Sequence, residues 1–326
     1  MSRIIAVHTE DELTAERPEL DRVNVDPIEL VEPLADCRVV GVCHVGRVRS
    51  ENQDFMGHFF ANEGHLLVVA DGMGGHNGGW EASHTVVDAC AQAFEEWTQE
   101  KSPLHLLSDC VQLSNTLLIE RSVKQPELQG MGSTFVGVYV WEGKAWFANL
   151  GDSRAYLIRK GTMTRISRDH SRVGMMVEAG LLTEEAARKH PMSNVLEMAL
   201  GVEDFVAPEM SAKPIALEEG DRFLLCSDGL WGLVPDEEIL ELFSDGDLQV
   251  QVDSALNLAL ERGGNDNITI ALLDYKGAFF DGKLRDSEGL VPRNRANLLA
   301  WELVMAAVVF ICVGFTWAAL QLQQTY

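Results

Sequence analysis

The chain has 326 residues, and 46% of them are hydrophobic, which is enough for one large core with appendages. Its 50 acidic against 26 basic residues give a formal net charge of −24. A chain this acidic would be repelled by a phosphate backbone, so we expect no nucleic-acid partner. Solubility alone can explain an acidic composition. A more specific explanation is that carboxylates gather around cations.

Cysteine usage and the N-terminus indicate the cellular compartment. None of the six cysteines forms a CxxC pair, so the spacing gives little support to a thiolate zinc site. Most of them lie in apolar runs, which indicates a reducing compartment without disulfides. The first 20 residues contain no apolar core of signal-peptide length, so we do not expect secretion by that route.

The first 36 residues differ in composition from the rest of the chain. They contain ten acidic and three basic residues, with prolines at 18, 27 and 33. No hydrophobic period is sustained in this stretch. We therefore expect residues 1–36 to form an acidic, flexible lead-in.

Residues 37–275 have the pattern of one mixed domain. Amphipathic helices are expected near 82–97 and 107–118, and further helices near 236–243 and 250–260. Hairpins and paired helices outnumber βαβ alternation, so we expect an α+β fold with antiparallel sheets covered by helices. Short apolar runs predict strands at 38–43, 66–70, 134–140, 145–150, 155–158, 223–226 and 268–273.

The C-terminal part of the chain contains a long apolar run. Residues 276–297 are polar and glycine-bearing, as linkers are, and residues 303–320 carry no charge. As a helix, these 18 residues would span about 27 Å, close to the thickness of a bilayer core. We predict a single transmembrane helix at 298–320 and a short tail at 321–326. A buried core helix is the weaker alternative, because the run is apolar on every face. Arg293 and Arg295 precede the run, which predicts that the large domain faces the cytoplasm at the cytoplasmic membrane.

Aspartates mark the ends of three apolar runs. Asp71 and Asp228 close two of them, and Asp266 precedes a third. If the third strand is antiparallel to the other two, the three carboxylates meet at one edge. Asp54 and Asp152 fit the same arrangement. Aspartate and glycine also favour turns for their own sake, but five such sites beside glycine, asparagine and arginine favour a site for Mg²⁺ or Mn²⁺.

Eight stretches, in the same order, resemble the type 2C (metal-dependent, PPM) serine/threonine protein phosphatases, and specifically their bacterial branch. The resemblance extends from about Val39 to Leu273. It implies two packed antiparallel sheets with helix pairs outside, an α-β-β-α sandwich. The stretches are GRVRSENQD, VVADGMGGHNGGWEAS, GSTF, ANLGDSRAYLI, SRDHS, EAGLLTEEAARKHPMSNVLEMALG, LLCSDGLWGLVPDEEI and GGNDNITIALL.

The resemblance also implies roles for individual residues. Asp71 would bridge two Mn²⁺ or Mg²⁺ ions, Arg49 would bind the substrate phosphate, and residues 172–201 would form a variable flap beside the site. Asp152 with Asp169 would help to hold a third ion. The ligands of the two main ions would be Asp54, Asp71, the Gly72 carbonyl, Asp228 and Asp266.

The implied reaction is hydrolysis of phosphoserine and phosphothreonine in proteins by a hydroxide that bridges the metals. Its implied partners are phosphorylated proteins and a Ser/Thr kinase that the enzyme opposes. Gln53 stands where many relatives have a glutamate, and Met73 stands where eukaryotic relatives have a histidine proposed as general acid. An inactive phosphoprotein-binding scaffold and a phosphohydrolase acting on small molecules such as nucleotides remain alternatives. So does a membrane adaptor with an inert soluble part.

Overall fold

The computed structural model describes residues 3–5, 24–34, 36–75, 78–244 and 246–277. Within those ranges, no helix is long and apolar enough to cross a membrane. The transmembrane helix predicted at 298–320 lies outside the described residues, as do most of the expected linker and the tail.

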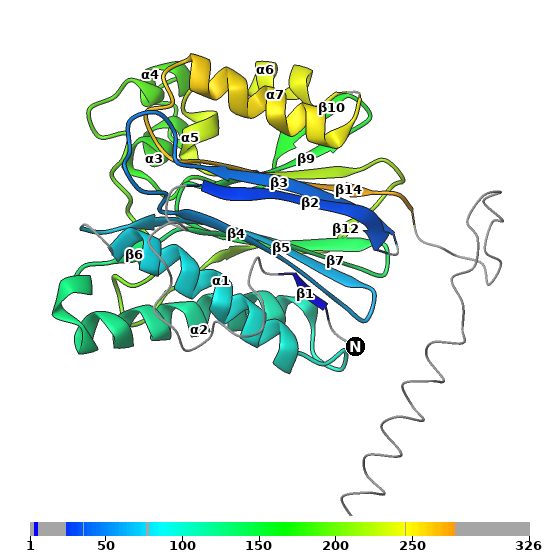
Figure 1. Ribbon diagram of the computed structural model, residues 1–326, viewed down its shortest axis with the longest axis horizontal. Coiled ribbons are helices and arrows are strands. Elements are labelled where there is room, and N and C mark those ends of the chain that lie inside the picture. The colour runs from blue at the N-terminus through cyan, green and yellow to red at the C-terminus, as the bar shows by residue number, and fades with distance from the viewer. Residues whose placement is uncertain (1–2, 6–23, 35, 76–77, 245, 278–326) are drawn as a thin grey trace, which may run out of the picture. The chain divides into compact units, whose positions relative to one another are not determined.

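The first sheet is antiparallel and carries most of the N-terminal half of the domain (Figure 1). Two-residue turns join its central hairpins. Asn62 and Glu63 make one of them with φ of 50° and 62°, the left-handed geometry that matches the twist of the flanking strands. The strand order is β1 (Arg3–Ile5), β4 (Asp54–Ala61), β5 (Gly64–Met73), β7 (Phe135–Trp141), β8 (Lys144–Leu150) and β11 (Glu209–Met210). In addition, β6 (Gly132–Ser133) pairs with β5, and β12 (Ile215–Ala216) pairs with β8.

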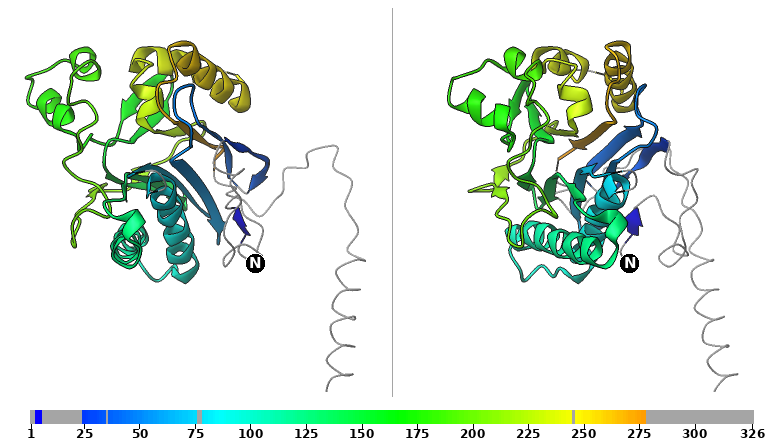
Figure 2. Two further views of the ribbon diagram at one scale, coloured as in Figure 1. Left: turned by 60° about the vertical axis from the view of Figure 1, so that its left-hand side comes forward. Right: turned by 90° about the vertical axis from the view of Figure 1, so that its left-hand side faces the viewer.

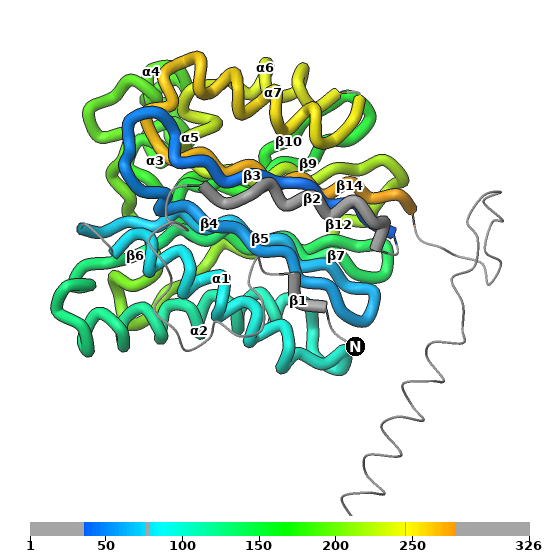
Figure 3. Tube along the Cα trace, viewed as in Figure 1, coloured from blue at the N-terminus to red at the C-terminus, as the bar shows by residue number. Residues whose placement is uncertain are grey.

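The second sheet is also antiparallel, and its strands come from both ends of the domain. Its central strand β14 pairs with β13 on one side and with β3 on the other. The first and last strands of the domain core thus lie side by side, and the chain trace shows this closure (Figure 3). The order is β10 (Thr162–Arg165), β9 (Arg154–Arg159), β13 (Arg222–Cys226), β14 (Ile268–Tyr275), β3 (Cys37–His44) and β2 (Asn24–Leu34).

Helices cover the outer faces of both sheets, and Figure 2 shows the resulting layers from two further sides. The pair α1 (Gly78–Glu96) and α2 (Pro103–Lys124) packs on the first sheet, and α5 (Asp228–Trp231), α6 (Asp236–Leu242) and α7 (Leu248–Glu261) pack on the second. Local signals start two of these helices. Ser102 accepts a hydrogen bond from the Leu104 N–H at the start of α2, and Asp247 caps α7 in the same way. The shorter helices are η2 (Pro126–Leu128), α3 (Arg172–Glu178) and α4 (Glu184–Arg188).

Three apolar layers hold the domain together. One lies between α1, α2 and the first sheet, one between the two sheets, and one between the second sheet and α5–α7. The layer between the sheets is built from alternate residues of each strand, such as Leu67 and Val69 on β5 and Phe223 and Leu225 on β13. At one end of this layer the strands finish in a group of aspartates.

The expected fold of two antiparallel sheets flanked by helices is confirmed. All seven predicted strands and all four predicted helices are present, with ends shifted by a few residues. The strand β4 was not predicted. Its sequence DFMGHFFA contains Gly57 and His58, which interrupt the apolar run, although β4 pairs along its whole length with the well-patterned β5.

The segment expected to be a flexible lead-in is partly regular. Residues 24–34 form β2, at the edge of the second sheet and antiparallel to β3. The register shifts between Val25 and Ile28 and again between Leu30 and Leu34, the two stretches that contain Pro27 and Pro33. Proline has no N–H to donate, so a proline-bearing strand is tolerated at an edge and is irregular there. The remaining lead-in residues fall mostly outside the described ranges.

The layer between the sheets generates a stability prediction. Phe223 is fully buried in that layer, and Phe223→Ala should lower the free energy of unfolding by about 3–5 kcal/mol, the usual cost of a large core cavity. Val123→Ala is the control, because Val123 on α2 is 78% exposed and its truncation should change little. Urea unfolding of both variants measures the difference. A loss below about 1 kcal/mol for Phe223→Ala would contradict this packing.

Candidate metal centre

One edge of the sandwich gathers the ends of strands that carry aspartates. Asp54 begins β4 directly opposite Asp71, near the end of β5. In the second sheet β13 and β14 are antiparallel, so Asp228, just after β13, lies at the same edge as Asp266, just before β14. The expected meeting of strand ends is therefore confirmed for this pair of strands, and β5 joins them from across the inter-sheet layer.

Hydroxyl groups fix the two aspartates on the first sheet. The Asp71 N–H donates to Thr134 Oγ1 at 2.9 Å, and the Asp71 carbonyl accepts from Ser133 Oγ at 3.0 Å. Ser227 Oγ donates to Asp54 Oδ2 at 2.6 Å. Ser227 precedes Asp228, so this contact ties the aspartates of one sheet to those of the other. Asp54 itself is only 2% exposed and lies beneath the surface of the site.

Two glycines let backbone segments approach closely. A Cβ on Gly72 would lie 1.9 Å from the Gly79 carbonyl oxygen, and a Cβ on Gly229 would lie 1.9 Å from the Asn267 carbonyl oxygen. Neither position tolerates a side chain, because the clash is with backbone. The glycine after each aspartate therefore has a steric cause in this structure. Gly72 itself lines the cavity described below.

Arg49 projects from the loop between β3 and β4. Its Nη2 donates to Asp266 Oδ2 at 2.7 Å, and its side chain is 49% exposed. Asn267 anchors this loop: its Nδ2 donates to the Val45 carbonyl at 2.9 Å and to the Glu51 carbonyl at 3.0 Å. The guanidinium is therefore placed beside the aspartates while remaining open to solvent.

Asp152 and Asp169, expected to share a third ion, have different surroundings. Asp152 is buried in the β8–β9 connection, where its carbonyl accepts from Trp231 Nε1 at 3.0 Å. Asp169 accepts from Arg154 Nη2 at 2.6 Å, and Arg154 also stacks on Trp231 at 3.8 Å from the ring centroid. The structure therefore brings Asp152 to the site and pairs the Asp169 carboxylate with an arginine.

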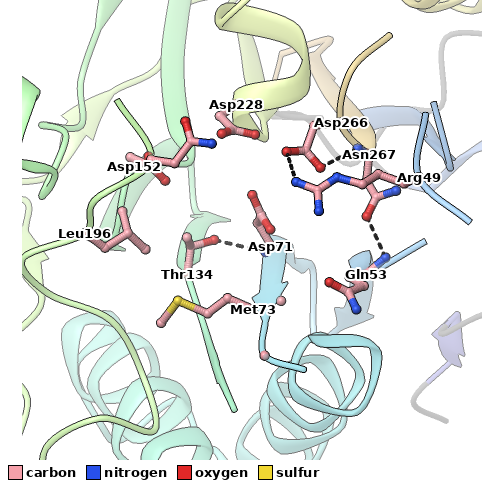
Figure 4. A pocket seen from close by; sticks show the side chains of 13 residues that line it. Arg49, Gln53, Asp71, Met73, Thr134, Asp152, Leu196, Asp228, Asp266 and Asn267 are labelled. Carbon is pink, nitrogen blue, oxygen red and sulfur yellow. Dashed lines mark hydrogen bonds and ion pairs between the residues drawn. The ribbon is translucent and has the colours of Figure 1, made fainter. Parts of the chain in front are cut away.

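These residues surround a cavity of about 200 Å³ (Figure 4). Within the described ranges, its walls contain no cysteine or histidine, so a covalent thiol or imidazole nucleophile has no support there. Four aspartates and one arginine supply the charge of those walls. The lining residues are Arg49, Gln53, Asp71, Gly72, Met73, Gly74, Thr134, Asp152, Asn194, Leu196, Asp228, Asp266 and Asn267.

Burial and mutual repulsion raise the pKa of the clustered carboxyl groups. Burial raises the pKa of Asp54 to about 6 and that of Asp152 to about 7, with the nearby Asp169 carboxylate adding to the second shift. The pKa values of Asp71 and Asp228 lie well above the usual range, first because of burial and then because of their carboxylate neighbours. The positive charge that the protein places around these carboxyl groups therefore does not offset the cost of burying them and bringing them together.

Divalent cations are the counterions that fit this donor set. Oxygen ligands only, from carboxylates and a backbone carbonyl, suit Mg²⁺ and Mn²⁺ rather than Zn²⁺. The donor atoms are spread more widely than the ligands of one ion would be. Within the described residues, the only compact group of three His, Cys, Asp or Glu ligand atoms lies elsewhere, at Asp36, Cys37 and His65. More than one ion is consistent with that spacing.

Sequence patterns missed several residues of the site. Thr134, Ser227 and Asn267 hold the aspartates and the arginine loop in place, but serine, threonine and asparagine are common in turns and give no signal of their own. Asn194 and Leu196 reach the cavity from the region 172–201, which was expected only as a flap. The signals that could have found three of them are the family stretches: Thr134 lies in GSTF, Ser227 precedes Asp228 in LLCSDGLWGLVPDEEI, and Asn267 follows Asp266 in GGNDNITIALL.

Comparison with known proteins identifies the class. The profile described as "Protein phosphatase 2C" matches residues 43–260. The serine/threonine phosphatase stp of Listeria monocytogenes is 35% identical over 234 residues, which are 70% of this chain and 92% of that one. The chain therefore belongs to the protein phosphatase 2C family. It is a serine/threonine phosphatase of the bacterial type, as the motifs predicted.

Solved structures agree. The serine/threonine phosphatase PstP of Mycobacterium tuberculosis has a TM-score of 0.67 at 33% identity, covering 74% of this chain and all of that one. The catalytic domain of PstP in complex with two manganese ions has a TM-score of 0.66 at 32% identity, covering 74% of this chain and 99% of that one. A protein of the same family and fold thus binds two manganese ions.

The raised carboxyl pKa values predict how Mn²⁺ should stabilise the protein. Protons and cations compete for the same carboxylates. Mn²⁺ binding should therefore strengthen as pH rises through the pKa values of Asp54, about 6, and Asp152, about 7. The rise in melting temperature caused by Mn²⁺, relative to EDTA, should therefore be small at pH 5.5 and larger at pH 8. Taking this difference removes the contribution of histidines, which titrate in both samples.

Asp152→Asn provides the matched control for that measurement. It removes the carboxyl group whose pKa is about 7, so the Mn²⁺ increment should depend less on pH between 6 and 8. An increment that is the same at pH 5.5 and pH 8 in the unmodified protein would show that the clustered carboxyl groups are not where Mn²⁺ binds.

Proposed function

We propose that this enzyme hydrolyses phosphoserine and phosphothreonine in proteins at the cavity between the two sheets, using two Mn²⁺ or Mg²⁺ ions. The observation that carries the proposal is the placement of Asp71, Asp228 and Asp266 around one cavity, with Arg49 at its open side. Bound there, two cations supply an acidified water as nucleophile and neutralise the phosphoryl oxygens.

Residues from both sheets would hold these ions. Asp71 lies centrally, between Asp54 on its own sheet and the aspartates of the second sheet, which suits the bridging role. Asp228 and Asp266 approach from the second sheet. The Gly72 carbonyl adds a neutral oxygen. Asp54, directly opposite Asp71 on β4 and hydrogen-bonded to Ser227, would supply the remaining carboxylate of the ligand set.

Arg49 is the candidate phosphate-binding group. A planar guanidinium can meet two phosphoryl oxygens at once. Here its Nη2 is engaged with Asp266 Oδ2 at 2.7 Å, an interaction that cations on Asp266 would weaken by competing for the carboxylate. Released from Asp266, the half-exposed side chain can turn to a phosphate at the mouth of the cavity.

A third ion held by both Asp152 and Asp169 would require a rearrangement around Asp169. Asp169 would have to release Arg154, which is buried and has Tyr156, Glu184 and Asp236 around it as well. Asp152, by contrast, faces the cavity (Figure 4). A third ion is therefore expected to rest mainly on Asp152 and the neighbouring Asp228.

Membrane attachment and opposition to a kinase complete the proposal. The uncharged run 303–320 and the basic residues before it support a single C-terminal span with the catalytic domain in the cytoplasm. A protein phosphoserine arises by phosphoryl transfer to a hydroxyl, so a Ser/Thr kinase must supply the substrate. Attaching the phosphatase and its phosphorylated substrates to one membrane would raise their effective concentration toward each other.

Kinetics of three variants test the separate roles proposed for Asp71 and Arg49. With Mn²⁺ and a phosphothreonine peptide, Asp71→Asn should lower kcat by about a hundredfold or more, because both ions lose a charged ligand. Arg49→Ala should act chiefly on KM, with a smaller loss of kcat. Arg159→Ala is the control, since Arg159 pairs with Asp221 at the far end of β9 and should leave both constants unchanged.

Four results would contradict the proposed reaction. The first is full turnover in excess EDTA, and the second is near-normal turnover by Asp71→Asn. The third is a much higher kcat/KM for nucleotides than for phosphopeptides, which would make the protein a small-molecule phosphohydrolase. No turnover at all on phosphopeptides in Mn²⁺ would favour the inactive scaffold instead.

Fractionation of cells that express the full chain tests the membrane span. The protein should pellet with membranes and stay there in high salt and in carbonate. A chain that ends at Asp286 should be soluble, with unchanged kcat on peptides, because every proposed ligand lies before residue 277. Extraction of the full chain by carbonate would refute the span and make the run a core or interface helix.

A further inference from the structure

A second cluster of ionisable side chains lies at the other end of the inter-sheet layer. On β5, alternate residues face this layer, so His65 points the same way as Asp71 but lies six residues earlier, roughly 20 Å away at about 3.4 Å per residue. Cys37 opens β3 in the facing sheet, and Asp36 precedes it. His58 of β4 lies diagonally across from His65.

The donor atoms of this cluster converge. One carboxylate oxygen of Asp36, the thiol of Cys37 and a ring nitrogen of His65 all lie within 4.8 Å of one another, and all three residues are buried. His65 Nε2 and Asp36 Oδ1 are 3.2 Å apart. Within the described part of the chain, no other three such side chains approach so closely. The cluster shares no residue with the cavity of the catalytic site.

Two of these atoms form a close ion pair but no hydrogen bond. His65 Nε2 and Asp36 Oδ1 are each without a hydrogen-bond partner among the described residues, although they lie 3.2 Å apart. The His65 side chain is fully buried, so water does not satisfy it. A buried polar atom without a hydrogen bond is unfavourable, and a bound ion would satisfy both atoms.

The other ring nitrogen of His65 contacts a second histidine. His65 Nδ1 is 3.1 Å from His58 Nε2. Burial, and then the nearby His65, lower the pKa of His58 to about 3, so His58 stays neutral and can share a hydrogen bond with its neighbour. Metal-binding histidines are commonly oriented in this way through their second nitrogen. The arrangement leaves Nε2 aimed at Asp36 and Cys37.

We propose that Asp36, Cys37 and His65 bind one Zn²⁺ ion that links the two sheets at the end opposite the catalytic site. Sulfur, imidazole nitrogen and carboxylate oxygen together suit Zn²⁺, whereas the catalytic cavity offers oxygen alone. Three protein ligands leave one position for water or the second oxygen of Asp36. Sequence spacing did not reveal this site, because its ligands do not form a CxxC pair. Cys37 and His65 lie on two strands and are 28 residues apart in the chain.

The alternative is a cluster without any ion. In that case a protonated His65 would pair with the Asp36 carboxylate, and Cys37 would remain a buried thiol. The two possibilities differ in whether the thiol is a ligand, because binding of Zn²⁺ replaces the thiol proton. A test must therefore report on sulfur and must keep the catalytic aspartates occupied by other ions.

The test uses the full-length chain purified in detergent and kept in excess Mg²⁺. After exposure to Zn²⁺ and dialysis, the protein should retain about one Zn²⁺ per chain. Replacement by Co²⁺ should give the near-ultraviolet thiolate-to-cobalt charge-transfer band. Cys37→Ser should abolish this band and weaken Zn²⁺ binding at least about tenfold in competition with a chromophoric chelator. Cys110→Ser, a change at a buried cysteine in α2, and Asp71→Asn should retain both.

If Cys37→Ser does not fold, His58→Gln gives an independent measurement. It leaves all three ligands in place and removes only the support of His65, so Zn²⁺ affinity should fall about tenfold while the cobalt band persists. Failure of the wild-type chain to retain Zn²⁺, or a cobalt band unchanged in folded Cys37→Ser, would overturn the proposal. Neither result would affect the assignment of the phosphatase site.

Discussion

Repulsion between carboxylates at one end of the inter-sheet layer is the constraint on which the rest of the site depends. Asp54 and Asp71 face each other across β4 and β5, and Asp228 and Asp266 approach from the second sheet. Among the described residues, Arg49 is the one cation in the cavity wall. Without further positive charge, burial and the neighbouring carboxylates hold the pKa values of Asp71 and Asp228 well above their usual range. The apolar layer behind them forces the strand ends together and keeps water out. The packing energy of the two sheets therefore holds together a cluster of carboxyl groups that would otherwise separate, which is the arrangement that divalent cations would stabilise.

The same constraint explains the neutral groups around the aspartates. Thr134, Ser227 and Asn267 each donate or accept hydrogen bonds that fix a backbone segment or a carboxylate, without adding charge. On the far side of Asp152, the buried Arg154 is shared between Asp169, Glu184 of α4 and Asp236 of α6. Because α4 lies within residues 172–201, which also supply Asn194 and Leu196 to the cavity wall, this ion cluster connects that segment to the second sheet. A buried arginine with several carboxylate partners is costly to break, so it favours one position of the segment.

Much of the fold and the charged core of the site could be predicted from the sequence, and the reasons are local. Runs such as HLLVVAD and RFLLCSD mark a buried strand and the aspartate that ends it, so Asp71 and Asp228 were identifiable without knowing the pairing. Features that depend on register were not identifiable. The hydroxyl partners of Asp71 and Asp54 come from residues 63 and 173 positions away. The pairing of Asp169 with Arg154, the strand β4 and the regular part of the N-terminal segment were missed for the same reason. The cluster of Asp36, Cys37 and His65 is likewise visible only once β3 and β5 are placed in facing sheets.

Crystals grown with Mn²⁺ and measured at the manganese absorption edge would show directly whether Asp71 contacts two ions. We expect two strong anomalous peaks in the inter-sheet cavity, both beside Asp71, one also beside the Gly72 carbonyl and the other beside Asp228 and Asp266. Arg49 should then have left Asp266. A single peak, or two peaks of which neither touches Asp71, would contradict the assignment of Asp71 as the bridging ligand and the two-ion account of the reaction.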